Sequence, residues 1–125
     1  MINYEEVIAI HNILIDEFGG SKGIRDHSLL ESAINRPFQT FDRQDLYTTP
    51  IDKSAAIFQS LIINHPFIDG NKRIAYVLMR LILKQYDLDI KATQDEKYEF
   101  VLTVARGEMD IDSIKDWIFA HIVQL

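Results

Sequence analysis

The 125-residue sequence contains no cysteine at all. This absence excludes disulfide bonds, zinc sites built on thiolates and cysteine nucleophiles. It is compatible with a reducing compartment, and we expect the protein to be cytoplasmic. The N-terminal residues carry neither the basic segment nor the apolar run of a secretory signal, which agrees with that expectation.

Proline and long apolar runs are also scarce. The three prolines, Pro37, Pro50 and Pro66, each lie near a break in a helical pattern, where proline is tolerated. The longest apolar stretches are interrupted by polar residues such as His65 and Lys84, and they are too short to span a membrane. The sequence therefore predicts no membrane partner.

Positive charge is in deficit, because the formal net charge is −6. Nucleic acids and anionic membranes select for lysine and arginine, so this balance argues against both as partners, while a local basic pocket stays open. Hydrophobic residues make up 47% of the sequence, which is enough for one core at this length. We expect one domain over residues 1–125.

Apolar residues recur at helical spacing along most of the chain, and this pattern predicts six helices. The third and fourth are apolar around most of their circumference, which is typical of buried helices. The predicted helices run from Asn3 to Phe18; from Asp26 or His27 to before Pro37; from Asp52, as the cap, to Ile63; from Gly70 or Asn71 to about Tyr86; from Thr93 or Gln94 to before Gly107; and from Asp110 or Asp112 onward, with Ile122 as its last inward residue.

Two segments depart from the helical pattern. Leu88–Lys91 is predicted to be short and extended. Residues 38–50 mix aromatic, threonine and charged side chains, and a loop of this length is often functional. We expect residues 38–47 to be a flap or a target-docking edge, and the segment 38–50 could form a short hairpin. The predicted fold class is all-α: a single compact domain of about six helices with a flap-like loop and no real sheet.

The connection between the two buried helices concentrates polar residues, which need partners when buried. The first N–H groups of a helix lack partners within the helix and lie at the positive end of its dipole. The start of the fourth helix, at Gly70 or Asn71, therefore predicts an anion site. Lys72 and Arg73 in its first turn oppose the dipole, which is unfavourable for the helix but favourable for a bound phosphate chain.

Other residues of this connection allow more than one role. Asp69 either caps the helix or holds a divalent cation such as Mg²⁺ that bridges phosphates. Asn71 contacts phosphate or fixes the turn, and Gly70 lets a ligand approach the backbone closely. His65 suits a general base toward a hydroxyl group. The remaining histidines show no ligand spacing and are interpreted as structural or exposed: His11, His27 and His121.

The stretch His65-Pro66-Phe67-Ile68-Asp69-Gly70-Asn71-Lys72-Arg73 resembles the signature of the Fic/Doc superfamily, in its Doc ("death on curing") branch. Gly23–Asp26 with Leu29–Ala33 also resembles the amino-terminal part of Doc-like proteins, and Ala105–Glu108 resembles the part before their last helix. The resemblance thus touches nearly the whole chain. The motif is specific, and the other matches are supportive.

The resemblance implies a protein-modifying transferase that uses a nucleoside triphosphate, such as ATP, together with Mg²⁺. In that family the motif histidine deprotonates a hydroxyl group of a target protein, and this role falls on His65. The acidic residue of the motif binds magnesium, which here is Asp69. The residues that follow cradle the nucleotide phosphates: Gly70, Asn71, Lys72 and Arg73.

Two positions separate the branches of the family. The larger Fic branch usually has glycine where this chain has Lys72 and a second arginine where it has Tyr76, and it transfers a nucleoside monophosphate, most often AMP. The Doc branch has lysine and transfers the terminal phosphoryl group, with a threonine of translation elongation factor Tu as its described target. This chain follows the Doc pattern, which favours kinase chemistry. A lysine would crowd and charge the space that glycine leaves open, so that the nucleotide sits differently.

Many Fic proteins carry an inhibitory helix with the spacing Ser/Thr-x-x-x-Glu, which does not occur in this sequence. We therefore expect restraint by a separate small antitoxin, as the resemblance to Doc-like toxins implies, in a toxin–antitoxin pair that arrests translation. Two alternatives stay open: nucleotidyl transfer on the same scaffold, and a non-catalytic protein-binding module. The sequence leaves the oligomeric state open.

Overall fold

The computed structural model describes residues 2–125 and contains six α-helices in that range, as predicted. Four short strands form two antiparallel pairs, β1 with β2 and β3 with β4. The all-α fold class is confirmed. The elements are α1 (Tyr4–Phe18), α2 (His27–Asn35), the 3-10 turn η1 (Arg36–Phe38), β1 (Thr40–Phe41), β2 (Gln44–Asp45), α3 (Pro50–Asn64), α4 (Asn71–Lys84), β3 (Leu88–Ile90), α5 (Gln94–Ala105), α6 (Ile111–His121) and β4 (Ile122–Gln124).

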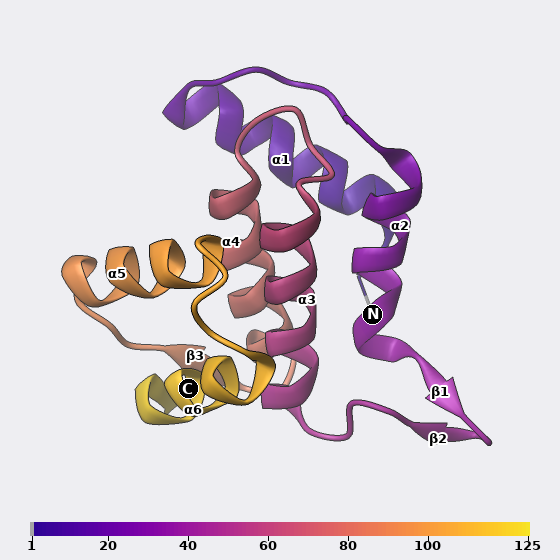
Figure 1. The fold of residues 1–125 in the computed structure, drawn as a ribbon, viewed down its shortest axis with the longest axis vertical. Helices are drawn as coiled ribbons and strands as arrows, with labels where there is room; N and C mark the ends of the chain where they lie inside the picture. Colours follow the sequence, from indigo (N-terminus) through magenta and orange to yellow (C-terminus); the bar gives the residue numbers. More distant parts are fainter. Residues whose placement is uncertain (1) are drawn as a thin grey trace.

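Helices α3 and α4 form the centre of the molecule. They run side by side in opposite directions, and the other four helices surround them (Figure 1). Phe58 and Leu61 of α3 and Leu78 and Met79 of α4 are completely buried. Because both helices are apolar around most of their circumference, they can be buried on several sides, as the sequence predicts.

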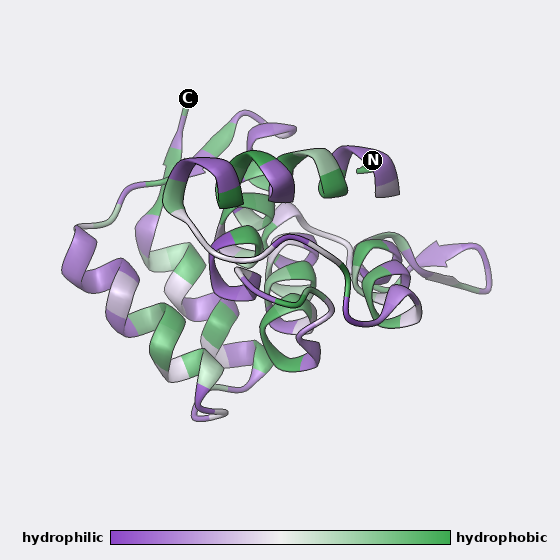
Figure 2. Ribbon diagram, turned by 90° about the horizontal axis from the view of Figure 1, so that it is seen from above, coloured by the Kyte–Doolittle hydropathy of each residue, from purple (hydrophilic) through white to green (hydrophobic). Residues whose placement is uncertain are grey.

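The surrounding helices turn apolar faces toward this pair. Figure 2 shows the green, apolar sides of the helices gathered toward the middle and purple, polar sides on the outside. Val7 of α1, Leu30 of α2 and Ile114 of α6 are fully buried, and Phe100 of α5 nearly so. Burial of these side chains is the main favourable term in folding. Within residues 2–125, no helix has the length and apolar character needed to cross a membrane.

The helix starts follow the usual capping chemistry, with one correction. Asn3 caps α1 by accepting the N–H of Glu6 at 2.8 Å, as predicted. Helix α3, however, begins at Pro50 and is capped by Thr49, while Asp52 closes a capping box. The prediction that Asp52 is the cap is therefore wrong. Proline suits the first helical position because it has no N–H to leave unpaired, so Pro50 starts this helix instead of preceding it.

The end of the chain also differs from the prediction. Helix α6 ends at His121, and Ile122, expected on its inward face, begins strand β4. Strand β4 pairs with β3, with Ile90 opposite Ile122 and Asp89 opposite Val123. The β-branched residues suit a strand. A helical spacing rule cannot detect this pairing, because the partner strand lies far upstream in the chain.

Residues 38–50 contain the β1–β2 hairpin that the sequence allowed. Buried Lys53 of α3 pairs with Asp45 of the hairpin at 3.3 Å. Arg36 donates to the hydroxyl of Tyr47 at 2.8 Å and to the hydroxyl of Ser60 on α3 at 2.9 Å. The base of the hairpin is thus fixed to α3 through charged and polar side chains.

The hairpin lies far from the predicted motif. It projects from the N-terminal end of α3, whereas His65 follows the C-terminal end (Figure 1). The 15 residues of α3 separate the two by about 20 Å at the usual rise of a helix. The hairpin therefore does not lie over the motif as a flap. Its alternative role as a target-docking edge stays a prediction.

Candidate active site

The predicted motif forms the connection between α3 and α4, and the α1–α2 loop (residues 19–26) packs along it. The carbonyl of Pro66 accepts the N–H groups of Arg25 and Asp26 at 2.8 and 3.0 Å. The N–H of Ile68 donates to the carbonyl of Gly23 at 3.1 Å, beside an isolated antiparallel bridge between the two segments. The motif is therefore held by the α1–α2 loop, and not by the hairpin.

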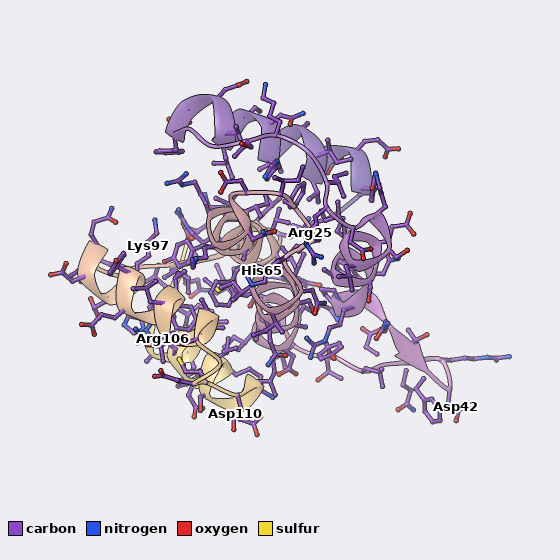
Figure 3. All side chains as sticks on the ribbon, turned by 45° about the horizontal axis from the view of Figure 1, so that its top comes forward. Arg25, Asp42, His65, Lys97, Arg106 and Asp110 are labelled. Atoms are coloured by element: carbon purple, nitrogen blue, oxygen red, sulfur yellow. The ribbon has the colours of Figure 1, made fainter. Side chains whose placement is uncertain are left out.

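His65 ends α3 in a left-handed backbone conformation, with φ 47° and ψ 58°. For a residue other than glycine this conformation costs about 1–2 kcal/mol. The guanidinium of Arg25 holds it in place by donating to the carbonyls of His65 and Asn64, both at 2.6 Å. A cation is favourable there, because the last carbonyls of a helix lack partners. The His65 side chain is exposed, and Figure 3 shows Arg25 beside it.

Asp69 and Gly70 form the turn that starts α4. Gly70 is the N-cap residue with φ 75°, and no side chain caps the first turn. The carboxylate of Asp69 instead accepts the N–H of Gly70 at 2.8 Å and that of Ser21 at 3.1 Å. The interpretation of Asp69 as the helix cap is therefore wrong, because its carboxylate turns toward its own following peptide and the α1–α2 loop. An uncapped N-terminus is what anion binding requires.

Asn71 fixes the turn from within. Its side chain is buried, donates to the carbonyl of Phe67 at 3.0 Å and accepts the N–H of Phe67 at 2.9 Å. The ring of Phe67 is buried in turn and stacks on His11 of α1, with centroids 3.8 Å apart. The Asn71 side chain is thus occupied by the turn. A contact of Asn71 with phosphate would fall to its backbone N–H.

A single cleft unites the predicted residues. Lys72 and Arg73 are exposed at its edge, and the guanidinium of Arg73 lies 4.4 Å from the ring centroid of Phe18. Both cations also border a second cleft of about 250 Å³ between α4 and α5, where Lys97 lies. An imidazole, a carboxylate, two cations and an uncapped helix terminus therefore share one small volume. This shared cleft, at the start of α4, measures about 380 Å³. It is lined by His65, Ile68, Asp69, Gly70, Asn71, Lys72 and Arg73.

The donor set of this cleft suits a hard cation only in combination with a ligand. Residues 2–125 hold no group of three or more histidine, aspartate or glutamate side chains that could enclose a metal ion. Mg²⁺, however, is commonly bound by one or two carboxylates together with phosphate oxygens and water. The exposed carboxylate of Asp69 accepts one N–H on each oxygen, which leaves further lone pairs for a cation. Asp69 therefore fits a shared magnesium–phosphate site.

Three residues outside the motif contribute to the cleft region, although the sequence analysis assigned none of them a role there: His11, Ser21 and Arg25. Their hydrogen bonds to the motif connect residues 58, 48 and 40 positions apart. Local spacing cannot report such contacts. Two signs were available: Arg25 lies in the stretch Gly23–Asp26 that resembles Doc-like proteins, and His11 shares the inward face of α1 with Val7 and Ile15.

Comparison with known proteins identifies relatives of this chain. A sequence model of the Fic/DOC family matches residues 1–83. A toxin Doc of Mycolicibacterium smegmatis is 35% identical over 115 residues, which cover 90% of this chain and 86% of that protein. A protein kinase doc of Escherichia phage P1 is 28% identical over 115 residues, which cover 92% of this chain and 90% of that protein. The two likenesses extend beyond residue 83, into the part that contains α5 and α6.

Proposed function

This chain belongs to the Fic/DOC family, and from that premise we propose that it is a Doc-like toxin that phosphorylates a hydroxyl group of a target protein. One observation carries the proposal: His65 and the uncapped N-terminus of α4 line the same cleft. A base and a phosphate cradle in one volume are what phosphoryl transfer to a hydroxyl needs, since such catalysis depends mainly on positioning and charge neutralisation. The names of the two relatives, a toxin and a protein kinase, support it.

The proposed roles follow from position. His65 accepts the proton of the target hydroxyl while that oxygen forms a bond to the γ-phosphorus of a nucleoside triphosphate such as ATP. The bond from phosphorus to the bridging oxygen breaks, and the nucleoside diphosphate leaves with the electron pair. Lys72, Arg73 and the backbone N–H groups from Asn71 onward bind the phosphates, and Gly70 lets them approach the backbone closely.

Asp69 is the proposed ligand for Mg²⁺, shared with the phosphates. When bound, the cation would neutralise phosphate charge. The protein orients the ligand: the N–H groups of Gly70 and Ser21 hold the Asp69 carboxylate, so that it is in place before any cation binds. This preorganisation agrees with a role in binding and not with a merely solvated side chain.

Lys72 favours phosphoryl transfer over nucleotidyl transfer. It lies in the first turn of α4 and lines the cleft, where a glycine would leave open space for a phosphate group. A side chain and a positive charge at this position displace the nucleotide, and so change which phosphorus atom faces the hydroxyl. A substitution of Lys72 therefore tests the alternative, which is transfer of AMP.

The cellular role that we propose is arrest of growth by modification of a component of translation, by resemblance a threonine of elongation factor Tu, in the cytoplasm. A small antitoxin protein would restrain the enzyme, in keeping with the relative named toxin Doc. A catalytically silent binding module predicts instead that growth arrest is independent of His65. Expression of the His65→Ala variant separates the two, because arrest that persists in this variant contradicts the enzymatic role.

The direct test uses cell lysate and ATP labelled separately at its α- and γ-phosphates. Phosphoryl transfer places label from γ, and not from α, on a protein acceptor, and the His65→Ala variant serves as the blank. Label from the α position would show nucleotidyl transfer and contradict the proposed chemistry. With Lys72→Gly, we expect a different mass increment on the target, read by mass spectrometry. An unchanged increment would count against the role assigned to Lys72.

A further inference from the structure

His11 of α1 lies directly behind the motif and is buried, with 1% of its surface exposed. Its Nε2 atom lies 2.7 Å from the carbonyl oxygen of Asp69. Its ring is stacked on Phe67 at an interplanar angle of 7°. A carbonyl oxygen can only accept, so Nε2 must carry the proton and donate. Buried His11 therefore holds the backbone of the proposed magnesium ligand, from a helix that begins near the start of the chain.

The fixed carbonyl of Asp69 has a consequence for the next N–H group. The peptide bond is planar and trans, so the carbonyl of Asp69 and the N–H of Gly70 point in opposite directions. When His11 fixes the carbonyl toward α1, the N–H of Gly70 is directed away from α1. That N–H is the group that donates to the Asp69 carboxylate at 2.8 Å. The orientation of the carboxylate thus depends on the hydrogen bond from His11.

The packing of α1 leaves little freedom at this turn. A Cβ atom added to Gly70 would lie 3.3 Å from His11 Nε2 and 3.2 Å from Ile15 Cδ1, closer than most such contacts. Gly70 also has φ 75°, which glycine adopts readily. This close approach keeps the imidazole within hydrogen-bond distance of the turn. Without the donor, the peptide between Asp69 and Gly70 could rotate and withdraw its N–H from the carboxylate.

We propose that His11 is a positioning residue of the active site: its Nε2–H fixes the Asp69–Gly70 peptide, and through it the Asp69 carboxylate and the first N–H groups of α4. This inference rests on the proposed function, because it assigns His11 to the magnesium–phosphate half of that site. His11 touches no reacting atom. Replacing it therefore acts on ligand binding and on the rate of transfer through geometry, as expected for groups behind a metal ligand.

Two substitutions of His11 distinguish the contribution of its Nε2–H donor from that of its aromatic ring. His11→Phe keeps an aromatic ring against Phe67 but removes the donor, whereas His11→Gln keeps a donor and removes the ring. His121→Phe is the matched control, because His121 also bonds a backbone carbonyl, that of Trp117 at 2.8 Å, but lies in α6 away from the cleft. Each variant is compared with the wild type for thermal midpoint, for Mg²⁺–ATP affinity by calorimetry, and for kcat and KM.

We expect His11→Phe to weaken Mg²⁺–ATP binding and to lower kcat by about 10-fold or more each, as loss of a partner behind a metal ligand usually does. His11→Gln should recover most of both losses, and His121→Phe should change neither. The proposal is overturned if His11→Phe binds Mg²⁺–ATP as the wild type does, or if its losses are no greater than those of His121→Phe at an equal drop in thermal midpoint.

A measurement on the unliganded wild-type protein keeps the inference testable should His11→Phe fail to fold, and separates it from the proposed function. Nitrogen-15 NMR of the histidine rings is expected to show His11 protonated at Nε2, with the Gly70 amide protected from hydrogen exchange. A proton found on Nδ1 alone would overturn the inference, whatever the enzyme does. If instead the proton is at Nε2 but the wild type transfers no label and binds no Mg²⁺–ATP, the proposed function fails and His11 is a structural residue.

Discussion

At the scale of single residues, His65 combines the proposed chemistry with backbone strain. Its left-handed conformation is unfavourable for a residue with a side chain. The guanidinium of Arg25 holds it by donating to the carbonyl of His65. Glycine commonly occupies this position after a helix because it adopts positive φ without penalty. The chain therefore gives up stability at the residue that the proposed mechanism requires. Strain of this kind is found at functional sites.

His65→Gly is accordingly expected to stabilise the protein while abolishing transfer. Relief of the left-handed strain should raise the free energy of unfolding by about 1 kcal/mol relative to His65→Ala, which retains a Cβ atom. Urea denaturation of the two variants measures the difference. Equal stability of the glycine and alanine variants would show that position 65 stores no strain.

Asn71 shows how a motif residue can serve structure. Its amide satisfies both backbone groups of buried Phe67, so Asn71→Ala leaves a buried N–H and a buried carbonyl without partners. We expect a loss of about 2–4 kcal/mol in unfolding free energy, from two unpaired polar groups. Chemical denaturation checks this value. Asn64→Ala, at the nearby end of α3, is the control and should lose far less; similar losses in both variants would contradict the role given to Asn71.

At the scale of elements, the helices followed from local spacing, and the errors on strand β4 and on the hairpin share one cause. Helices α1, α2, α4 and α5 begin and end within two residues of the predicted bounds, because apolar periodicity and capping residues are local signals. Strand β4 escaped prediction because its partner β3 precedes α5 and α6 in the chain. The β1–β2 hairpin and the motif lie at opposite ends of α3. The spacing of apolar residues does not predict how a helix is oriented in the fold, so it could not show this separation.

The contact between α5 and α6 makes a pH-dependent contribution to stability. Burial alone lowers the pKa of His121, but the hydrogen bonds to the carbonyl of Trp117 and the carboxylate of Glu96 outweigh it and raise that pKa above 6.5. The hydrogen bond from the Thr93 backbone and the one from His121 lower the pKa of Glu96 to about 2. Because the folded pKa of His121 is raised, its contribution is complete below pH 6.5 and is lost as pH rises through the folded value.

His121→Gln should therefore lower the thermal midpoint more at mildly acidic pH than at alkaline pH. The difference between wild type and variant is expected to be constant from about pH 5.5 to 6.5 and then to shrink as the pH rises toward about 9, because the imidazole of the folded protein loses its charge. Thermal melts across that range measure it. Introducing Glu96→Gln should weaken this trend without removing it, because the hydrogen bond to the Trp117 carbonyl also raises the pKa of His121. A difference that is constant with pH would contradict a charged His121.

At the scale of the whole molecule, the α3–α4 pair is both the core and the support of the cleft. The C-terminal end of α3 and the N-terminal end of α4 present the motif, and the buried turns behind them fix its position. The sequence revealed the motif and the helices that carry it. It could not reveal that the α1–α2 loop and His11 contact the motif, since those contacts depend on how distant segments pack. Prediction failed for these tertiary contacts and succeeded for most local features, although the cap of α3, a local feature, is Thr49 and not the predicted Asp52.

Hydrogen exchange should show that α3 and α4 form the most stable part of the molecule. Amides in the buried middle of α3 and α4, such as those of Phe58 and Leu78, are expected to exchange through unfolding of the whole molecule. Amides of the exposed β1–β2 hairpin should exchange faster by about 100-fold or more, because a two-residue ladder opens locally. Exchange followed by mass spectrometry tests this order. If the amides of α5 exchanged more slowly than those of α3, the most stable part of the molecule would not be the α3–α4 pair.

The most direct test of the central claim, that His65 and the N-terminus of α4 act on one substrate, separates binding from transfer. Mg²⁺–ATP affinity and transfer of the γ-phosphate label are measured together for the wild type, His65→Ala and Lys72→Ala. We expect His65→Ala to bind within about twofold of the wild type and to transfer no label, because a base contributes little to ground-state binding. We expect Lys72→Ala to lose affinity. Transfer by His65→Ala at the wild-type rate would contradict the claim.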